Sequence, residues 1–478
     1  MDTGLKELSD LLSGLPYSYR VSDFSKEIKG KYDSYEGKEV NVAGRVVAIR
    51  KSGKLVFADL LDRTGRIQIY FDYSAIGEKA FGEAKRLNAG DIIGVRGTVF
   101  KTKPGEISVK SIEYTLLSKA MRTLPDKWHG LQDVETRYRK RHLDLIMNDE
   151  SRDVFAKRSR VISLIRGFLD GQGFLEFETP VIQPLYGGAD AEPFKVRVNT
   201  LDEEHYLRIS DELYLKRLII GGFDRVYEIY KAFRNEDIDS THSPEFTMIE
   251  WYQAYADYND MMDLSESLLR AICKGMTGSH ETEYQGGRIG FGGKFRRIGY
   301  MKSIEEKTGV DITRIGDDEL FKLAGSHGIR FEKGKMTRVH AYDKLFSALV
   351  QPGIVQPTFV IDYPRDSSPL TRPKRGDPGM TERFELYIAG MEIANAYSEL
   401  NNPVIQRENF EKEMKKAELG DRDAEPLDMD FVEAMEYGMP PTGGLGLGID
   451  RLVMIFADKS SIKEVILFPM ERRGDSKH

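Results

Sequence analysis

Three segments of the sequence concentrate charged and aromatic side chains of kinds that bind nucleotides. The first, residues 233–252, places Arg234 and Glu236 two positions apart, before a polar loop and a second apolar run that ends in Glu250 and Tyr252. Because alternate residues of a strand point to the same face, this pattern predicts an antiparallel hairpin with one charged face. No glycine-rich loop of the G-x-x-x-x-G-K type occurs in the sequence, so phosphate binding here would depend on charges on strands and on metal ions.

The second segment is rich in acids. Glu385 and Glu392 are seven residues apart and would share a face if they were helical. Asn395, Tyr397 and Glu399 alternate as the residues of a strand do. A pair of glutamates is usually a solvent-exposed feature, so this segment alone does not establish a site.

The third segment, residues 443–452, is a glycine-spaced strand that enters a helix near Arg451. Taken alone, Gly-Asp-Arg at a helix start is often a capping feature. The presence of all three segments in one chain favours a functional site. The sequence contains neither a G-x-S-x-G elbow nor an H-E-x-x-H pair, which leaves serine hydrolase and zinc protease chemistry without support.

The elements around these segments predict two kinds of domain. Five short β-rich runs, with a helical stretch at about 75–87 after the third, fit a closed barrel of the oligonucleotide-binding (OB) type. These runs cover residues 39–46, 54–60, 66–71, 91–99 and 106–109. Arg45, Phe57 and Gln68 are candidates for the face that binds unstacked bases, although Phe57 in the core and Arg45 as a solvated charge are an equal alternative.

After residue 150 the pattern changes to helices and strands. Apolar residues at helical spacing from Ser151 to Gly171 predict a long amphipathic helix, followed by a strand that runs into Pro180. Such a helix needs a partner surface, in the same chain or in a second copy. Between about 275 and 345 the pattern weakens, which indicates an insertion with local helices.

Composition limits the class of protein. The chain has 478 residues, 40% of them hydrophobic, and 70 Lys and Arg against 77 Asp and Glu, for a net charge of −7. No apolar run approaches the roughly 18 residues that a membrane helix needs. One cysteine excludes an internal disulfide framework, and the N-terminus has no secretory pattern. We therefore expect a cytoplasmic protein without membrane partners.

Together the segments resemble the three signature motifs of class II aminoacyl-tRNA synthetases. Further stretches resemble the lysyl-tRNA synthetase family; they include residues 124–131, 141–145, 212–217, 241–248 and 397–401. The resemblance implies an α+β protein with an OB-fold anticodon-binding domain (1–120), a linker (121–150) and a class II catalytic domain (151–478, with the 275–345 insertion). It also implies an antiparallel catalytic sheet flanked by helices, and a homodimer with Pro180 at the interface.

The resemblance implies a reaction and a role for each site residue. Lysine is activated by ATP to lysyl-adenylate and then joined to tRNA(Lys), with Mg²⁺ as cofactor. The ATP site would comprise Arg234, Glu236, His242, Phe246, Glu385 and Arg451; of these, Arg234 and Arg451 would be catalytic, and Glu385 with Glu392 would hold the metal. The lysine site would comprise Gly188, Glu212, Glu250, Tyr252, Asn395, Tyr397 and Glu399.

The chain departs from the family pattern near this lysine site. Ser210 and Asp211 stand where the family commonly has Ala-Pro, and Ala394, Ala396 and Tyr397 stand where it commonly has Gly, Gly and Phe. The nearest alternative is an aspartyl- or asparaginyl-tRNA synthetase, which would need cationic groups in the pocket. A non-catalytic tRNA-binding paralogue is a second alternative, but it has no use for metal and phosphate ligands.

Overall fold

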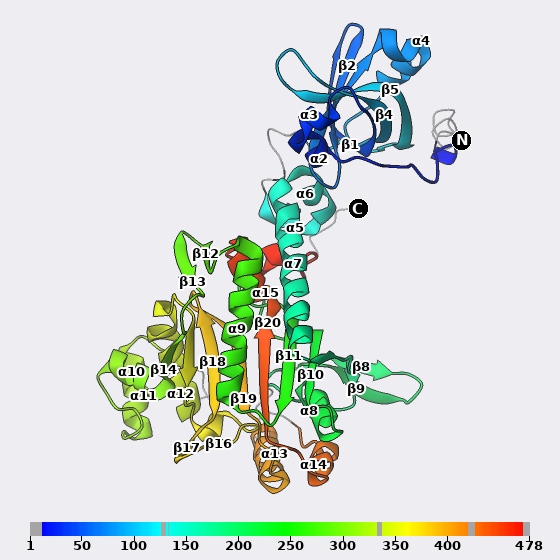
Figure 1. The fold of residues 1–478 in the computed structure, drawn as a ribbon. Coiled ribbons are helices and arrows are strands. Elements are labelled where there is room, and N and C mark those ends of the chain that lie inside the picture. The colour runs from blue at the N-terminus through cyan, green and yellow to red at the C-terminus, as the bar shows by residue number, and fades with distance from the viewer. Residues whose placement is uncertain (1–11, 126–130, 132, 332–336, 419–425, 472–478) are drawn as a thin grey trace. The chain divides into compact units, whose positions relative to one another are not determined.

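The computed structural model describes residues 12–125, 131, 133–331, 337–418 and 426–471, and the chain forms two compact units, 1–132 and 133–478 (Figure 1). Part of the stretch predicted to join the domains, residues 126–130 and 132, lies outside this description. Among the described residues no helix is long and apolar enough to cross a bilayer.

The first unit is a closed barrel with the strand order β1-β2-β3-β5-β4. Its strands are β1 (Glu39–Ser52), β2 (Leu55–Leu61), β3 (Arg66–Asp72), β4 (Ile92–Lys101) and β5 (Ile107–Ser118), and its helices are α2 (Ser25–Gly30), α3 (Tyr32–Tyr35) and α4 (Tyr73–Ala84). Alternate residues of each strand are buried, for example Val56, Ala58 and Leu60 of β2, and they fill the barrel. This confirms the predicted five-stranded barrel with a helix after the third strand.

The second unit is organised around an eight-stranded sheet with the order β14-β15-β18-β19-β20-β11-β10-β6. Its strands are β6 (Leu175–Glu176), β10 (Arg225–Phe233), β11 (Glu245–Ala254), β14 (Arg296–Gly299), β15 (Thr358–Ile361), β18 (Arg383–Ile388), β19 (Met391–Ser398) and β20 (Thr442–Gly448). The six inner strands pair antiparallel, as predicted, whereas each edge strand pairs parallel. Glu385 and Glu392 lie on β18 and β19 of one hairpin, so the helical interpretation of their spacing was wrong.

Three helices cover one face of this sheet: α7 (Asp149–Gly171), α9 (Tyr258–Thr277) and α15 (Ile449–Ala457) (Figure 1). The sequence of helix α9 explains where this helix begins and ends and which face it buries. The Asp257 and Asp260 side chains form a capping box at its start, and Gly278 ends it in the left-handed conformation. Its apolar residues pack with Leu445 and Leu447 of β20 in the main core. The other face of the sheet is left for the site.

Smaller layers flank the sheet at its two sides. The described part of the predicted insertion contains β12 (Glu281–Tyr284), β13 (Gly287–Gly290), α10 (Tyr300–Thr308), α11 (Asp317–Ser326) and α12 (Arg338–Leu349), and the three helices have a core of their own against β15 and β18. A second cluster joins α8 (Glu212–Ile220), α13 (Pro403–Glu418) and α14 (Met429–Glu436). The remaining elements are short: β7 (Ile182–Gln183), β8 (Lys195–Val198), β9 (Glu203–Leu207), η1 (Gln351–Gly353), η2 (Arg365–Ser367), β16 (Pro373–Lys374), β17 (Asp377–Thr381) and α16 (Ile462–Val465).

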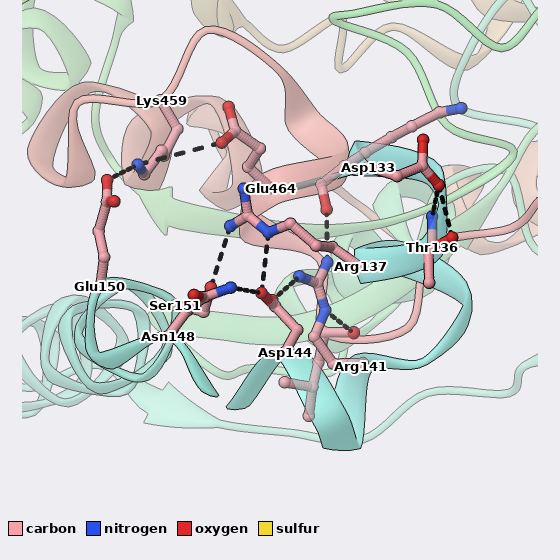
Figure 2. A network of polar contacts seen from close by, with 12 residues as sticks. Asp133, Thr136, Arg137, Arg141, Asp144, Asn148, Glu150, Ser151, Lys459 and Glu464 are labelled. Carbon is pink, nitrogen blue, oxygen red and sulfur yellow. Dashed lines mark hydrogen bonds and ion pairs between the residues drawn. The ribbon is translucent and has the colours of Figure 1, made fainter. Parts of the chain in front are cut away.

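A buried polar network holds the start of the second unit. Helices α5 (Val134–Arg139) and α6 (Arg141–Met147) carry Arg137 and Arg141, and both donate to the carboxylate of Asp144, at 2.8 and 2.7 Å (Figure 2). Asn148 donates to the same group, while Arg141, which is 2% exposed, also donates to backbone carbonyls of residues 463–467. The basic side chains of this segment therefore tie α6 to the C-terminal end of the unit.

We expect Asp144→Ala to lower the free energy of unfolding by about 3–5 kcal/mol, because it leaves buried Arg141 without its anion. Burial alone would raise the pKa of Asp144, but the hydrogen bonds from Asn148 and the two arginines lower it. The stabilisation is therefore present above the ordinary aspartate pKa and is lost as the pH falls through the lowered one. Urea denaturation of the unaltered protein and of Asp144→Ala, at pH 7 and at pH 3, measures the free energy of unfolding.

The control is Asp153→Ala, which removes an exposed ion pair with Lys157 and should cost less than about 1 kcal/mol. Equal losses in the two variants would show that the Asp144 network does not hold the unit together.

Candidate functional site

A cavity of about 360 Å³ lies on the side of the sheet opposite to α7 and α9. Most of the predicted site residues line it: Gly188, Glu212, Arg234, Glu236, His242, Phe246, Glu250, Tyr252, Glu392, Asn395, Tyr397, Glu399 and Arg451. Glu385 lines an adjoining cavity, which shares His242, Glu392 and Arg451 with the first. The fold thus brings together residues that are more than 250 positions apart in the chain.

The cavity exists because β20 presents no side chain to it. Leu445 and Leu447 point into the helical core, and the alternate positions Gly444, Gly446 and Gly448 line the cavity. A Cβ at position 444 would overlap the carboxylate of Glu399 and the ring of Tyr252. The glycine-leucine alternation of the third sequence segment therefore sets the floor of the site.

Strand register places the charged groups on either side of this floor. Gly444 pairs with Tyr252 on β11 and with Tyr397 on β19. Gly446 pairs in the same way with Glu250 and with Asn395. Side chains from the hairpin of the first segment and from the strand of the second therefore face each other across a gap that only backbone lines.

One end of the cavity is acidic and buried. Glu399 is 0% exposed, and among the described residues no hydroxyl or amide group donates to its carboxylate. It forms an ion pair with the ammonium group of Lys216. Burial raises the pKa of Glu399 to about 8, with Lys216 opposing this and Glu212 adding to it. A carboxylate in this position is held ready for a cationic ligand.

Glu250 supports the same wall through a saturated set of hydrogen bonds. Its carboxylate accepts from Ser210 Oγ at 2.9 Å, from Tyr230 at 2.5 Å and from Tyr252 at 2.7 Å. Ser210 Oγ also accepts from the backbone N–H of Glu212, at 3.1 Å. The serine that replaces the common alanine thus joins Glu250 to the start of α8.

Gly188 allows a loop to approach this corner closely. Its φ is +85°, and a Cβ there would come within 2.8 Å of both Ser210 Oγ and Glu212 Cβ. Any other residue would push the loop away from Glu212.

The other end of the cavity is cationic and aromatic. The guanidinium of Arg234 lies 5.2 Å from the ring centroid of Phe246. Arg451 donates to the backbone carbonyl of Glu392 at 2.8 Å and contacts His242 Nε2 at 3.2 Å. An aromatic ring and two guanidinium groups in one cavity suit a flat, polyanionic ligand such as a nucleotide.

Two acids stand beside these arginines. Glu385 accepts hydrogen bonds from the hydroxyls of Tyr363 and Tyr387 and pairs with Arg383 at 2.5 Å. Loss of water in the cleft, followed by repulsion from Glu385, raises the pKa of Glu392. Two mutually repelling carboxylates fit a divalent cation, although among the described residues no three acidic, histidine or cysteine side chains form a complete metal site.

The barrel has a separate groove. Phe57 and Gln68 line it together with basic and aromatic side chains, which include Lys29, Arg50, Arg66, Tyr70 and Phe100. Arg45 lies elsewhere, because its guanidinium donates to the backbone carbonyl of Gly90 at 2.8 Å. Of the three residues predicted to bind bases, Phe57 and Gln68 therefore line this groove and Arg45 does not.

Comparison with known proteins finds a match for each of the two units. A family model described as tRNA synthetases class II (D, K and N) matches residues 133–472, and an OB-fold nucleic acid binding domain matches residues 40–117. A lysine–tRNA ligase of Clostridium botulinum (strain Loch Maree / Type A3) is 49% identical over 95% of this chain and 90% of its own. One of Clostridium novyi (strain NT) is 48% identical over 95% and 89%, and one of Clostridium perfringens (strain 13 / Type A) 47% over 95% and 91%.

The chain belongs to the lysine–tRNA ligase family of class II tRNA synthetases.

Three residues of this synthetase escaped the sequence analysis. Lys216 pairs with two pocket glutamates, and its signal was a lysine four residues after Glu212 within an apolar helical run. Arg383 holds Glu385 and donates to Asn395 Oδ1 at 3.2 Å. Arg158 of α7 pairs with Asp450 and so anchors the helix that carries Arg451, a contact between distant segments that has no local signal.

We expect Gly444→Ala to remove most lysine-dependent activity of this synthetase, because the added methyl group overlaps Glu399 and Tyr252. The KM for lysine should rise by more than about 100-fold, on the scale of a buried steric clash, with little change in the KM for ATP.

The matched control is Gly446→Ala, two residues along the same strand. There a Cβ would meet the end of Met248 at 3.3 Å and Glu250 Cγ at 3.4 Å, and a flexible methionine can move aside. The effect on lysine should be at least tenfold smaller than at position 444. Similar KM values for both variants would contradict the assigned floor of the cavity.

Proposed function

We propose that the cavity activates lysine with ATP to form lysyl-adenylate and transfers the lysyl group to the 3′ end of tRNA(Lys). The observation that carries this proposal is the buried cluster of three acids, Glu212, Glu250 and Glu399, in which Lys216 is the paired cation. Acids that outnumber their cations in a buried corner favour a cationic ligand, and the ε-ammonium of lysine supplies one. An aspartyl or asparaginyl enzyme would need cationic groups lining this end of the pocket, and Lys216 does not line it.

Arg234 is the central group of the activation step. The lysine carboxylate attacks the α-phosphate, so no side chain has to act as nucleophile, and catalysis consists of positioning and charge stabilisation. The planar guanidinium of Arg234 can contact the carboxylate and the α-phosphate together, which a lysine side chain cannot do with the same geometry.

The nucleotide lies between aromatic and cationic groups. Phe246 stacks on one face of the adenine, while Arg451 covers the other face and meets the γ-phosphate. His242 Nδ1 is 2.8 Å from Asp239, so the imidazole donates there and its Nε2 accepts from Arg451. Glu236 lines the same part of the cavity.

Glu385 and Glu392 hold Mg²⁺, which when bound neutralises phosphate charge. Two carboxylates are a usual protein contribution when the remaining ligands are phosphate oxygens and water. The hydroxyls of Tyr363 and Tyr387 fix the orientation of Glu385 for this role.

Lysine is recognised at both of its ammonium groups. Glu212, next to Gly188, takes the α-ammonium, and Asn395 lies near the carboxylate. Glu399 and Tyr252 take the ε-ammonium, with Glu250 holding Tyr252 in place. A neutral side chain would supply no cation to a corner whose acids outnumber Lys216, so the site discriminates against it.

The tRNA and a second subunit complete the proposal. Phe57 and Gln68 in the barrel groove bind unstacked anticodon bases. Pro180 is exposed beside other exposed apolar side chains, which include Leu175, Val181, Ile182 and Leu185, and these suit a homodimer interface. We place the reaction in the cytoplasm, where ATP and tRNA are available.

Lysine-dependent exchange of pyrophosphate into ATP tests this function. We expect exchange with lysine and none with aspartate or asparagine. Glu399→Gln should raise the KM for lysine roughly 10- to 100-fold, the scale of one charge-assisted hydrogen bond, and leave the KM for ATP within about twofold.

Glu281→Gln, at an exposed ion pair with Arg288, is the control and should behave as the unaltered enzyme. Exchange with aspartate would favour the aspartyl alternative, and exchange with no amino acid would favour a tRNA-binding paralogue. An unchanged KM for lysine in Glu399→Gln would remove Glu399 from the pocket.

Phe57→Ala tests the barrel. The loss of one stacked base, about 1–3 kcal/mol, should raise the KM for tRNA(Lys) while pyrophosphate exchange stays unchanged. Arg45→Ala is the comparison, because Arg45 lies outside the groove, and its KM for tRNA should not change. If Phe57→Ala impairs both steps equally, the ring supports folding instead.

A further inference from the structure

Lys216 is a buried cation that the reaction as described does not use. It lies on α8, one turn after Glu212, and is 1% exposed. Its Nζ is 2.5 Å from Glu212 Oε1, and it also pairs with the Glu399 carboxylate. The two glutamates that would bind the two ammonium groups of the substrate are therefore bridged by one side chain of the protein.

Lys216 stands behind these glutamates and not in the cavity. Glu212, Tyr252 and Glu399 line the cavity, and Lys216 does not. Its Nζ lies 5.9 Å from the ring centroid of Tyr252. The two glutamates therefore form part of the cavity wall, while the ammonium that pairs with both of them does not.

The charges of this corner are complementary to lysine. Glu212, Glu250 and Glu399 contribute three carboxyl groups and Lys216 one ammonium, so the acids of this corner outnumber its cation. Free lysine carries two ammonium groups, and its carboxylate belongs at the arginine end of the cavity. Burial and repulsion from Glu250 and Glu228 raise the pKa of the neighbouring Asp211 well above its usual range.

We propose that Lys216 is a positioning residue of the amino-acid site, which holds Glu212 and Glu399 at a fixed separation and so sets the length of the diamine that fits between them. This inference rests on the proposed roles of the two glutamates. Without the bridging cation, the carboxylates repel each other and can rotate apart. Selection between lysine and ornithine, which is one methylene shorter, should then weaken.

Lys216→Met tests this with pyrophosphate exchange driven by lysine or by ornithine. The unaltered enzyme should strongly prefer lysine. In Lys216→Met we expect a KM for lysine higher by roughly 10- to 100-fold, a KM for ATP within about twofold, and a ratio of kcat/KM for lysine over ornithine that falls at least about tenfold. The exposed Lys294, paired with Asp263, supplies the control Lys294→Met, which should change nothing.

The pH profile separates positioning from mere structural support. A proton on Glu399 competes with the ε-ammonium, so in the unaltered enzyme the KM for lysine should fall as the pH rises toward about 8 and level off above it. The charged and titratable groups that face Glu399 are Lys216, Glu212, Glu250 and Tyr252. Removing the cation raises the pKa of Glu399 further, so in Lys216→Met the KM for lysine should fall at a higher pH than in the unaltered enzyme. Lys216→Arg should restore the pH at which the KM for lysine falls.

The outcomes are distinct. If the unaltered enzyme shows no lysine-dependent exchange, the proposed function fails; if it does, and Lys216→Met keeps both the lysine preference and the pH profile, this inference alone is overturned. If Lys216→Met does not fold, the test uses Lys216→Arg, which keeps the cation and should keep the pH dependence of the KM for lysine. A displaced pH dependence in Lys216→Arg would overturn the inference. A lowered preference for lysine over ornithine at an unchanged KM for ATP supports the proposal, and an unchanged preference rejects it.

Discussion

The cost of burying carboxylates governs the structure of this site. Glu212, Glu250 and Glu399 lie where water is excluded, and each needs a partner. Glu250 has three hydroxyl donors, and Glu212 and Glu399 share the cation Lys216. The acids of this corner outnumber its cation, and this imbalance is the basis of the lysine recognition proposed above.

The glycines of β20 make room for these acids. A central strand of a sheet normally fills both faces with side chains, but β20 alternates leucine, which packs under the helices, with glycine, which leaves the cavity open. The register of the neighbouring strands then places Glu250, Tyr252, Asn395 and Tyr397 beside this opening. A rigid sheet backed by three helices suits a reaction that depends on positioning, because errors of about 1 Å are costly there.

Side chains that do not contact the proposed substrates hold the site residues in place. Arg158 holds Asp450 beside Arg451, Arg383 holds Glu385, and the two tyrosines orient the same carboxylate. The barrel, which forms the other unit, keeps its own core and its own groove. The proposed chemistry and the proposed base recognition therefore belong to separately packed units.

The sequence alone determined the two domain types, the strand sequence of the barrel and the residue types of the site, because alternation, helical spacing and the three segments are local patterns. It did not determine that Glu385 and Glu392 pair across a hairpin, that Arg45 turns away from the groove, or that Lys216 bridges two glutamates. These features depend on which segments meet in space and on the burial that follows. Charge balance inside a cavity is a property of the packed chain, so only the tertiary structure could decide it.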